Sequence, residues 1–182
     1  MSKPVEVEDY DPRWPEVYAM LSEPLYSALS GIAQRIEHVG STSVPGLAAK
    51  PIIDLTVVIG TRDDLPAAIN ALRAIGYHHE GDLGIPGREA FTTPPGAPSH
   101  HLYVCAKNSP QLAQQLMFRD FLRAHPDIAL AYATLKRSLA ERFTYDRSAY
   151  TAAKSAFIEQ TLTKATDLTQ SGDSGVPNDA PQ

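Results

Sequence analysis

Residues 38–57 decide the fold of this chain, and they read HVGSTSVPGLAAKPIIDLTV. The pattern predicts a short strand, a tight turn at Gly40-Ser41, a loop of small residues and a second, apolar strand that carries Asp54. Because glycine has no Cβ, the backbone N–H groups of such a turn can approach a phosphate closely. A carboxylate on the neighbouring strand can hold a divalent metal against the same phosphates. The stretch therefore indicates a phosphate-binding turn beside a metal ligand.

This stretch resembles the signature of the GrpB family, a branch of the nucleotidyltransferase superfamily, in which Gly-Ser is followed by an acidic residue on the next strand. Gly40, Ser41 and Asp54 match that hallmark. Thr56 departs from it, because the superfamily usually has a second carboxylate two residues on and on the same strand face. The resemblance continues from about residue 10 to residue 158 and includes the segments 87–91, 100–104, 118–126 and 145–154.

The resemblance implies an α/β (α+β) fold, with a nucleotidyltransferase-like mixed sheet and a C-terminal helical half. It also implies a metal-dependent nucleotidyltransferase that binds a nucleoside triphosphate and transfers its nucleotidyl group to an acceptor. Thr56 favours another hypothesis, a non-catalytic protein that binds a nucleotide or another phosphorylated small molecule on a degenerate nucleotidyltransferase fold. Hydrolysis of a phosphate ester at a metal held by histidine and aspartate is a third hypothesis.

Strand alternation predicts which of the polar side chains share a face. If Asp54 faces a cleft, Thr56 does so too, and on a later strand His101 shares a face with Tyr103. The superfamily normally places its third carboxylate in this later region, so the resemblance gives that role to His101. Asp54 and His101 are then the expected catalytic residues and ligands of Mg²⁺ or Mn²⁺, with His101 completing the coordination or acting as a base. The structural alternatives are a buried acid that bonds to the glycine turn and a hydrogen-bonded histidine.

Turn residues and several cations are expected to bind the phosphates. The predicted phosphate- and nucleotide-binding residues are Gly40, Ser41, Thr42, Lys50, Arg88, Arg119, Lys136 and Lys154. Arg119, Lys136 and Lys154 are included because they fall within the stretch that resembles the family. Arg88 lies in a glycine-rich loop, where its guanidinium can clamp a phosphate or a carboxylate, or form a salt bridge that shapes the loop.

One further cluster lies late in the chain. Arg147, Tyr150 and Lys154 fall on one helical face at i, i+3 and i+7. Such a cluster either binds a triphosphate or is a solvated helix face.

Composition narrows the class of protein. Of 182 residues, 43% are hydrophobic and 20% charged, which is ordinary for a soluble globular protein. The net charge of −5 argues against a general nucleic-acid binder. The single cysteine, Cys105, cannot form an internal disulfide and fits a reducing cytoplasm. Since the sequence shows no secretory leader and no apolar run of membrane-spanning length, we expect a cytoplasmic protein that does not contact a membrane. A Gly-x-Ser-x-Gly elbow and a P-loop are also missing from the sequence.

Periodicity predicts one domain over residues 1–166, with a sheet part at about 1–106 and a helical part at about 107–166. The first helix is expected to begin at Pro12, with Asp11 as its cap and a kink or division at Pro24. Further helices are expected over 63–76, 110–124, 126–142 and 147–164, the last capped by Asp146, and strands over 34–39, 51–59, 89–93 and 101–105. The composition of residues 167–182 predicts a disordered tail. A cleft between the sheet and helical parts is the expected place for a site.

Overall fold

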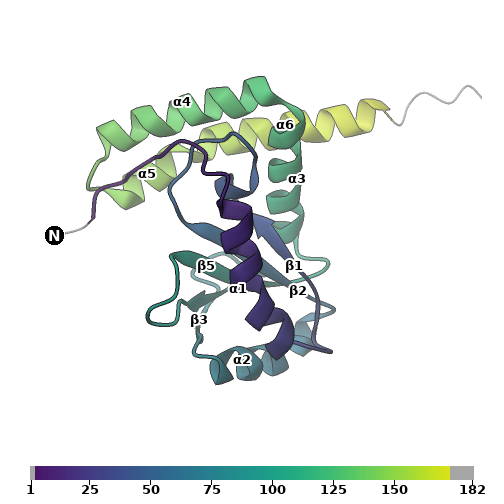
Figure 1. Cartoon of the computed structure of the whole chain (residues 1–182). Coiled ribbons are helices and arrows are strands. Elements are labelled where there is room, and N and C mark those ends of the chain that lie inside the picture. Colours follow the sequence, from purple (N-terminus) through teal and green to yellow (C-terminus); the bar gives the residue numbers. More distant parts are fainter. Residues whose placement is uncertain (1–2, 173–182) are drawn as a thin grey trace, which may run out of the picture.

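The centre of the structure is a five-stranded mixed sheet with the strand order β1-β2-β5-β4-β3 (Figure 1). The computed structural model describes residues 3–172, and in it the strands are β1 (Ala33–Val39), β2 (Ile53–Ile59), β3 (His78–Gly81), β4 (Glu89–Thr92) and β5 (His100–Ala106). β2 pairs with β5 in parallel and with β1 antiparallel, whereas β4 pairs antiparallel with both β5 and β3. Both edges of β2 are therefore covered, as its run of apolar, β-branched residues predicts.

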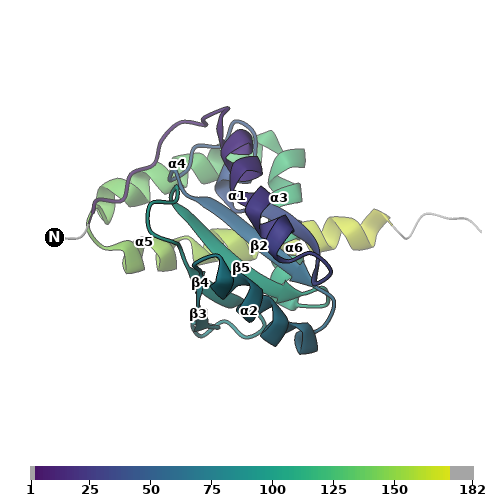
Figure 2. The same cartoon turned by 60° about the horizontal axis from the view of Figure 1, so that its bottom comes forward.

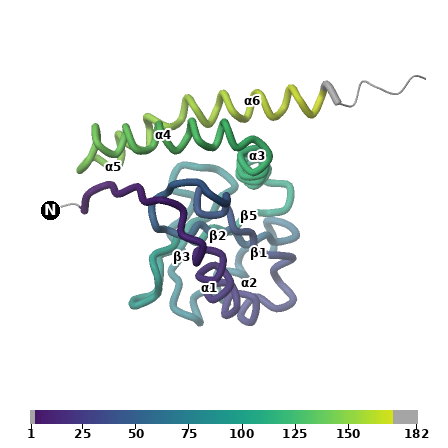
Figure 3. The backbone as a smooth tube through the Cα atoms, turned by 45° about the horizontal axis from the view of Figure 1, so that its top comes forward, coloured from purple at the N-terminus to yellow at the C-terminus, as the bar shows by residue number. Residues whose placement is uncertain are grey.

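Helices cover both faces of this sheet. The helices are α1 (Trp14–Ala28), α2 (Leu65–Ala74), α3 (Pro110–Ala124), α4 (Pro126–Arg142), α5 (Arg147–Ala153) and α6 (Ser155–Gly172). Figure 2 shows α1 and α2 in front of the sheet and α4, α5 and α6 behind it. Figure 3 shows the same separation, with α4, α5 and α6 running across one side of the molecule. This arrangement confirms the predicted mixed sheet followed by a helical half.

Strand alternation divides the side chains of β2 and β5 between the two faces. Leu55 and Val57 point into the main core, which they share with Leu25 of α1 and Leu72 of α2. The opposite face carries the predicted site residues, and there Asp54 lies opposite His101 in the register of the two strands. This second face is covered by the helical half, because α3 packs a leucine against it near the far end of both strands.

The beginning of α1 differs from the prediction. The helix begins at Trp14 and has Pro15, not Pro12, in its first turn, and it runs through Pro24 without interruption. Asp11 does not cap it. Its carboxylate instead accepts hydrogen bonds from the backbone N–H and the guanidinium of Arg13. A local ion pair therefore takes the acceptor that was expected to cap the helix.

The edge and the end of the chain also differ from expectation. β3 lies within residues 77–106, which the sequence indicates as β structure, but no separate strand is predicted there because its exposed side chains lack apolar alternation. The single helix expected over 147–164 is divided at Lys154, whose N–H bonds to the carbonyl three residues earlier. Asp146 does cap α5, accepting from the N–H of Ala149 at 2.9 Å. α6 then continues to Gly172, past the expected start of the tail, and residues 173–182 of that tail lie outside the described residues. Within residues 3–172, no helix combines the length and apolar character needed to cross a membrane.

Candidate functional site

The turn after β1 is shaped by contact between Gly40 and Asp54. Gly40 has φ 70° and ψ −172°, a region that essentially only glycine occupies. A Cβ placed on Gly40 would lie 2.2 Å from Oδ2 of Asp54. Glycine is therefore required here for two reasons, its backbone conformation and the close approach of the carboxylate. From the sequence, we expected a glycine here so that a phosphate could approach the turn. In the structure, the side chain of Asp54 occupies the space beside Gly40.

Asp54 and His101 form a hydrogen-bonded pair at the end of the two parallel strands. Nδ1 of His101 lies 2.7 Å from Oδ1 of Asp54. An ionised carboxylate can only accept, so Nδ1 carries the proton and Nε2 keeps its lone pair. That assignment agrees with the other contact of the ring, in which Nη2 of Arg147 donates to Nε2 at 3.4 Å. Asp54 thus fixes the orientation and tautomer of an imidazole whose free nitrogen faces a cation.

This pair does not form a metal centre by itself. Nδ1, the ring nitrogen nearer to Asp54, is already bonded to that carboxylate. In the part of the chain that the structure describes, no three or more His, Cys, Asp or Glu side chains gather around a point that a metal ion could occupy. Mg²⁺ prefers several oxygen ligands in octahedral geometry, and Asp54 is the single carboxylate here.

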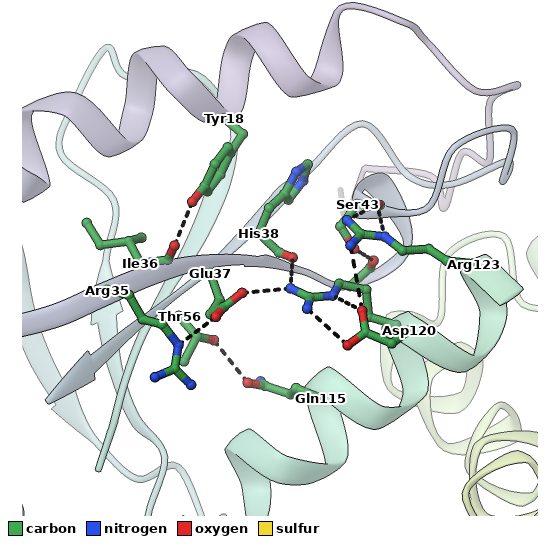
Figure 4. Close-up of polar contacts among 12 residues, drawn as sticks. Tyr18, Arg35, Ile36, Glu37, His38, Ser43, Thr56, Gln115, Asp120 and Arg123 are labelled. Carbon is green, nitrogen blue, oxygen red and sulfur yellow. Dashed lines mark hydrogen bonds and ion pairs between the residues drawn. The ribbon is translucent and has the colours of Figure 1, made fainter. Parts of the chain in front are cut away.

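Thr56, which stands at the expected position of a second carboxylate, is fully buried. Its Oγ1 donates to Oε1 of Gln115 on α3 at 3.0 Å, as Figure 4 shows. α3 therefore covers this position, although strand alternation correctly places it on the same face as Asp54. Glu89 does not replace the missing acid, because its carboxylate is held by Arg62 and His79 elsewhere.

A polar cavity of about 270 Å³, here called the cation cavity, opens between the sheet and the helical half. Its lining residues are Ser41, Thr42, Ala49, Lys50, Ile52, Asp54, His101, Lys136, Arg147, Tyr150, Thr151 and Lys154. Four of them, Lys50, Lys136, Arg147 and Lys154, are cations. Among residues 3–172, none of these four forms an ion pair with a carboxylate. The cavity is thus a strongly positive pocket beside the Asp54–His101 pair.

Burial makes the positive charge of the cation cavity costly. Lys136 is only 2% exposed, and burial together with the neighbouring cations Lys154, Arg137 and Lys50 lowers its pKa to about 7. Burial likewise lowers the pKa of Lys154 to about 8, helped by Lys50 and opposed by Asp54. A lysine at the surface usually keeps a pKa of about 10.4. Lysines with strongly lowered pKa values are found more often at functional sites. An anion in the cavity would restore their charge.

Aromatic rings hold the lysines in place. Nζ of Lys154 lies 4.6 Å from the centroid of the Tyr150 ring, and Nζ of Lys50 lies 5.3 Å from the same centroid. Lys136 lies over the ring of Tyr132 at 4.6 Å, and its ammonium donates to the carbonyl of Ala48. These cation–π contacts orient the ammonium groups without neutralising them.

The structure brings most, but not all, of the predicted binding residues together. Ser41, Thr42, Lys50, Lys136 and Lys154 line the cation cavity, whereas Gly40 and Arg88 line a neighbouring one. Arg147 and Tyr150 complete the cation cavity, and their helical spacing with Lys154 was the signal for them.

Arg119 lies outside both cavities. Its guanidinium pairs with Glu37 at 2.8 Å and with Asp120 at 2.7 Å, and it donates to the carbonyl of His38 at 3.1 Å. One turn later on α3, Arg123 donates to the carbonyl of Ser43 at 2.7 Å. Figure 4 shows Glu37, Asp120 and Arg123 gathered around the end of β1 and the turn that follows it. These arginines therefore hold the turn in place and do not reach the cavity.

Comparison with known proteins places this geometry in context. Residues 4–164 match the GrpB protein family. The chain is 34% identical over 155 residues to UPF0157 protein YqkA of Bacillus subtilis, covering 85% of this chain but 45% of that protein, so it spans less than half of that relative. The crystal structure of conserved protein GrpB from Enterococcus faecalis matches with a TM-score of 0.81 and 33% identity over 91% of this chain and 99% of that one. A structure of the Cid1 poly(U) polymerase with MgGTP bound matches with a TM-score of 0.53 and 17% identity over 75% of this chain and 45% of that one. The last likeness shows the fold alone, and it confirms the predicted nucleotidyltransferase-like fold.

Proposed function

The chain belongs to the GrpB family, and from that premise we propose that it binds a nucleoside triphosphate and transfers the nucleotidyl group to an acceptor. One observation carries the proposal: four cations without carboxylate partners in the described residues surround a single cavity that also contains Asp54 and His101. In a nucleotidyltransferase, the polyphosphate of the nucleotide lies beside the reacting groups. This cavity has cations that suit a polyphosphate and, next to them, two side chains that can take part in a reaction.

The charges of the cation cavity match a polyphosphate. Lys50 lies in the loop before β2, whereas Arg147 and Lys154 lie at the two ends of α5. All three line one cavity, so a chain of phosphates can contact several of them at once. Each contact is a charge-assisted hydrogen bond in a partly dry environment, where such bonds are strong. A ligand with a single charge would leave most of these cations without a partner.

The Asp54–His101 pair supplies the group that handles the proton. In the proposed step, the acceptor oxygen bonds to the α-phosphorus and the bond from that phosphorus to the bridging oxygen of pyrophosphate breaks. The guanidinium of Arg147 moves from Nε2 of His101 to the pyrophosphate, and the acceptor proton passes to the lone pair of Nε2 that this exposes. Asp54 stabilises the imidazolium that results, because its carboxylate accepts from Nδ1. Arg147 and Lys154 stabilise the negative charge on the departing pyrophosphate.

The described side chains do not fit a metal centre built by the protein alone. Asp54 and His101 bond to each other, and no third ligand of the usual type lies beside them in the described residues. The expected Mg²⁺ or Mn²⁺ would therefore reach Asp54 as part of a metal–nucleotide complex, with phosphate oxygens supplying other ligands.

A second candidate function is nucleotide binding without turnover. The observation that favours it is the burial of Thr56 and its hydrogen bond to Gln115, which close the position of a second carboxylate. In that case the cation cavity would sense a nucleotide or another phosphorylated small molecule.

Calorimetric titration with ATP, in the presence and absence of Mn²⁺, tests the binding. We expect Lys154→Gln to weaken ATP binding at least about tenfold, since it removes a charge-assisted contact. Lys164→Gln is the matched control, because Lys164 is an exposed lysine of α6 outside the cavity. Equal affinities for the two variants would contradict the proposal.

Pyrophosphate release separates the two candidate functions. If the chain is a transferase, His101→Asn should keep ATP binding and lose the release of pyrophosphate. If it is a binding protein, the wild type should bind ATP and release no pyrophosphate with any acceptor.

A further inference from the structure

A second cavity of about 280 Å³ adjoins the cation cavity, and Asp54 lines both. Its lining residues are Val39, Gly40, Asp54, Arg88, Tyr103, Gln111, Gln114, Gln115, Phe118, Ile158 and Leu162. We propose that this second cavity, called the Arg88 cavity, binds the acceptor, and that the acceptor is a small molecule with one carboxylate and an apolar body. The acceptor role rests on the proposed function, whereas the carboxylate site rests on the geometry alone.

Arg88 is the group that would recognise the carboxylate. Its guanidinium lies 4.3 Å from the centroid of the Tyr103 ring, which holds it by a cation–π contact. Its Nε is buried and, within the described residues, has no hydrogen-bond partner. Glu89, the adjacent acid, is not available to it, because Arg62 and His79 hold that carboxylate at 3.3 and 2.8 Å. A buried donor without a partner is costly, and an arginine fork fits a carboxylate with two parallel bonds.

The balance of charge favours a ligand with a single negative charge. Arg88 is the one cation among the lining residues of this cavity, and Asp54 lies in the same wall. A polyphosphate here would be repelled by Asp54 and would leave the four cations of the neighbouring cavity unused. The two cavities are therefore complementary to different ligands, a polyanion on one side of Asp54 and a monoanion on the other.

The other lining residues of the Arg88 cavity indicate the chemistry of the rest of the ligand. Gln111 and Gln114 of α3 offer amide donors and acceptors, whereas Phe118, Ile158 and Leu162 are apolar. Gln115 contributes less, since its amide oxygen is already bonded to Thr56. A volume near 280 Å³ suits a small molecule and not a polymer. A hydroxyl or amine of that molecule placed at Asp54 would lie at the boundary between the two cavities, next to a nucleotide whose phosphates occupy the cation cavity.

The test follows the side-chain Nε–H signal of Arg88 by NMR, assigned with the Arg88→Gln variant. The probe is 3-phenyllactate, which carries a carboxylate, a hydroxyl and an apolar ring. Phenyl phosphate and 3-phenyl-1,2-propanediol are the phosphate and uncharged controls. We expect phenyllactate to shift this signal, the diol to leave it unchanged, and phenyl phosphate to act more weakly. Arg88→Gln should weaken phenyllactate binding at least about tenfold, while Arg73→Gln, at an exposed arginine of α2 outside both cavities, should not.

Three results would overturn the proposal. The first is no shift with phenyllactate, or an equal shift with the diol. The second is a shift with ATP but not with inorganic triphosphate, because the cavity would then hold the base of the nucleotide. The third is phenyllactate binding in a chain that binds neither ATP nor triphosphate, which would refute the proposed function and the acceptor role together while leaving a carboxylate site. An effect of phenyllactate with intact ATP binding supports both.

Discussion

Replacing Lys136 by methionine should stabilise the chain and weaken its ligand binding at the same time. Burial lowers the pKa of this lysine from its usual 10.5 to about 7. At about 1.4 kcal/mol per pH unit, a buried lysine of this kind destabilises the folded state by about 4 kcal/mol at pH 7. The variant also loses the hydrogen bond from Lys136 to the Ala48 carbonyl, which lowers its stability by about 2 kcal/mol. Since methionine has a similar shape, Lys136→Met should gain about 2 kcal/mol, or roughly 4–8 °C in melting temperature.

The gain should depend on pH. A lysine whose pKa is lowered by folding destabilises the folded state most below the folded pKa of about 7, and this effect disappears as the pH approaches 10.5. The advantage of the Lys136→Met variant should therefore shrink toward zero near pH 9. Thermal melts at pH 6, 7 and 9 measure this, with Lys164→Met as a surface control that should change stability by less than about 0.5 kcal/mol.

Binding supplies the other half of this prediction. If Lys136 is kept for a phosphate, Lys136→Met should lose at least about tenfold in ATP affinity by calorimetry at pH 7. A Lys136→Met variant that is less stable than the wild type and binds ATP equally well would contradict both parts of this prediction. Lys136 would then be a structural residue whose purpose is to hold the Ala48 carbonyl.

Three other predictions concern the turn, the missing acid and pH. Gly40→Ala should lower the free energy of unfolding by about 3 kcal/mol, because its Cβ would lie 2.2 Å from Oδ2 of Asp54. At Gly46, which also has positive φ but has open space around it, the same change should lower it by only about 1 kcal/mol. Equal losses in denaturant unfolding would exclude the close contact as the cause. Thr56→Asp should destabilise the chain by about 3 kcal/mol and leave Mn²⁺ binding unchanged, because it buries a charge under α3. Stronger Mn²⁺ binding would show that a side chain at position 56 does reach the site beside Asp54. ATP affinity should fall at least about tenfold as the pH rises from about 7 to about 9, since Lys154, with a pKa of about 8, and Lys136, with a pKa of about 7, lose their protons. A flat calorimetric profile would contradict the role of both lysines.

The local features of this fold could be predicted from the sequence. The apolar run ending in Ile59 predicts a strand paired on both edges, and the spacing of Asp54 and Thr56 predicts their shared face. These inferences succeed because they depend on the period of a strand and on turn chemistry, which neighbouring residues determine.

The rest depends on contacts between distant parts of the chain. Thr56 is closed off by Gln115, which lies 59 residues later. Arg119 pairs with Glu37, which lies 82 residues earlier. Its position in a segment that resembles the family therefore did not predict a contact with a ligand. Which cations remain without a partner is a property of tertiary packing, and sequence spacing reveals it only for the cluster at Arg147 and Lys154.

A crystal structure of the chain with a non-hydrolysable ATP analogue and Mn²⁺ would show where a nucleotide binds. We expect the triphosphate to lie in the cation cavity, with phosphate oxygens about 3 Å from Lys50, Arg147 and Lys154. If the analogue binds elsewhere on the molecule, or the cation cavity stays without it at millimolar concentration, the cavity is not a nucleotide site.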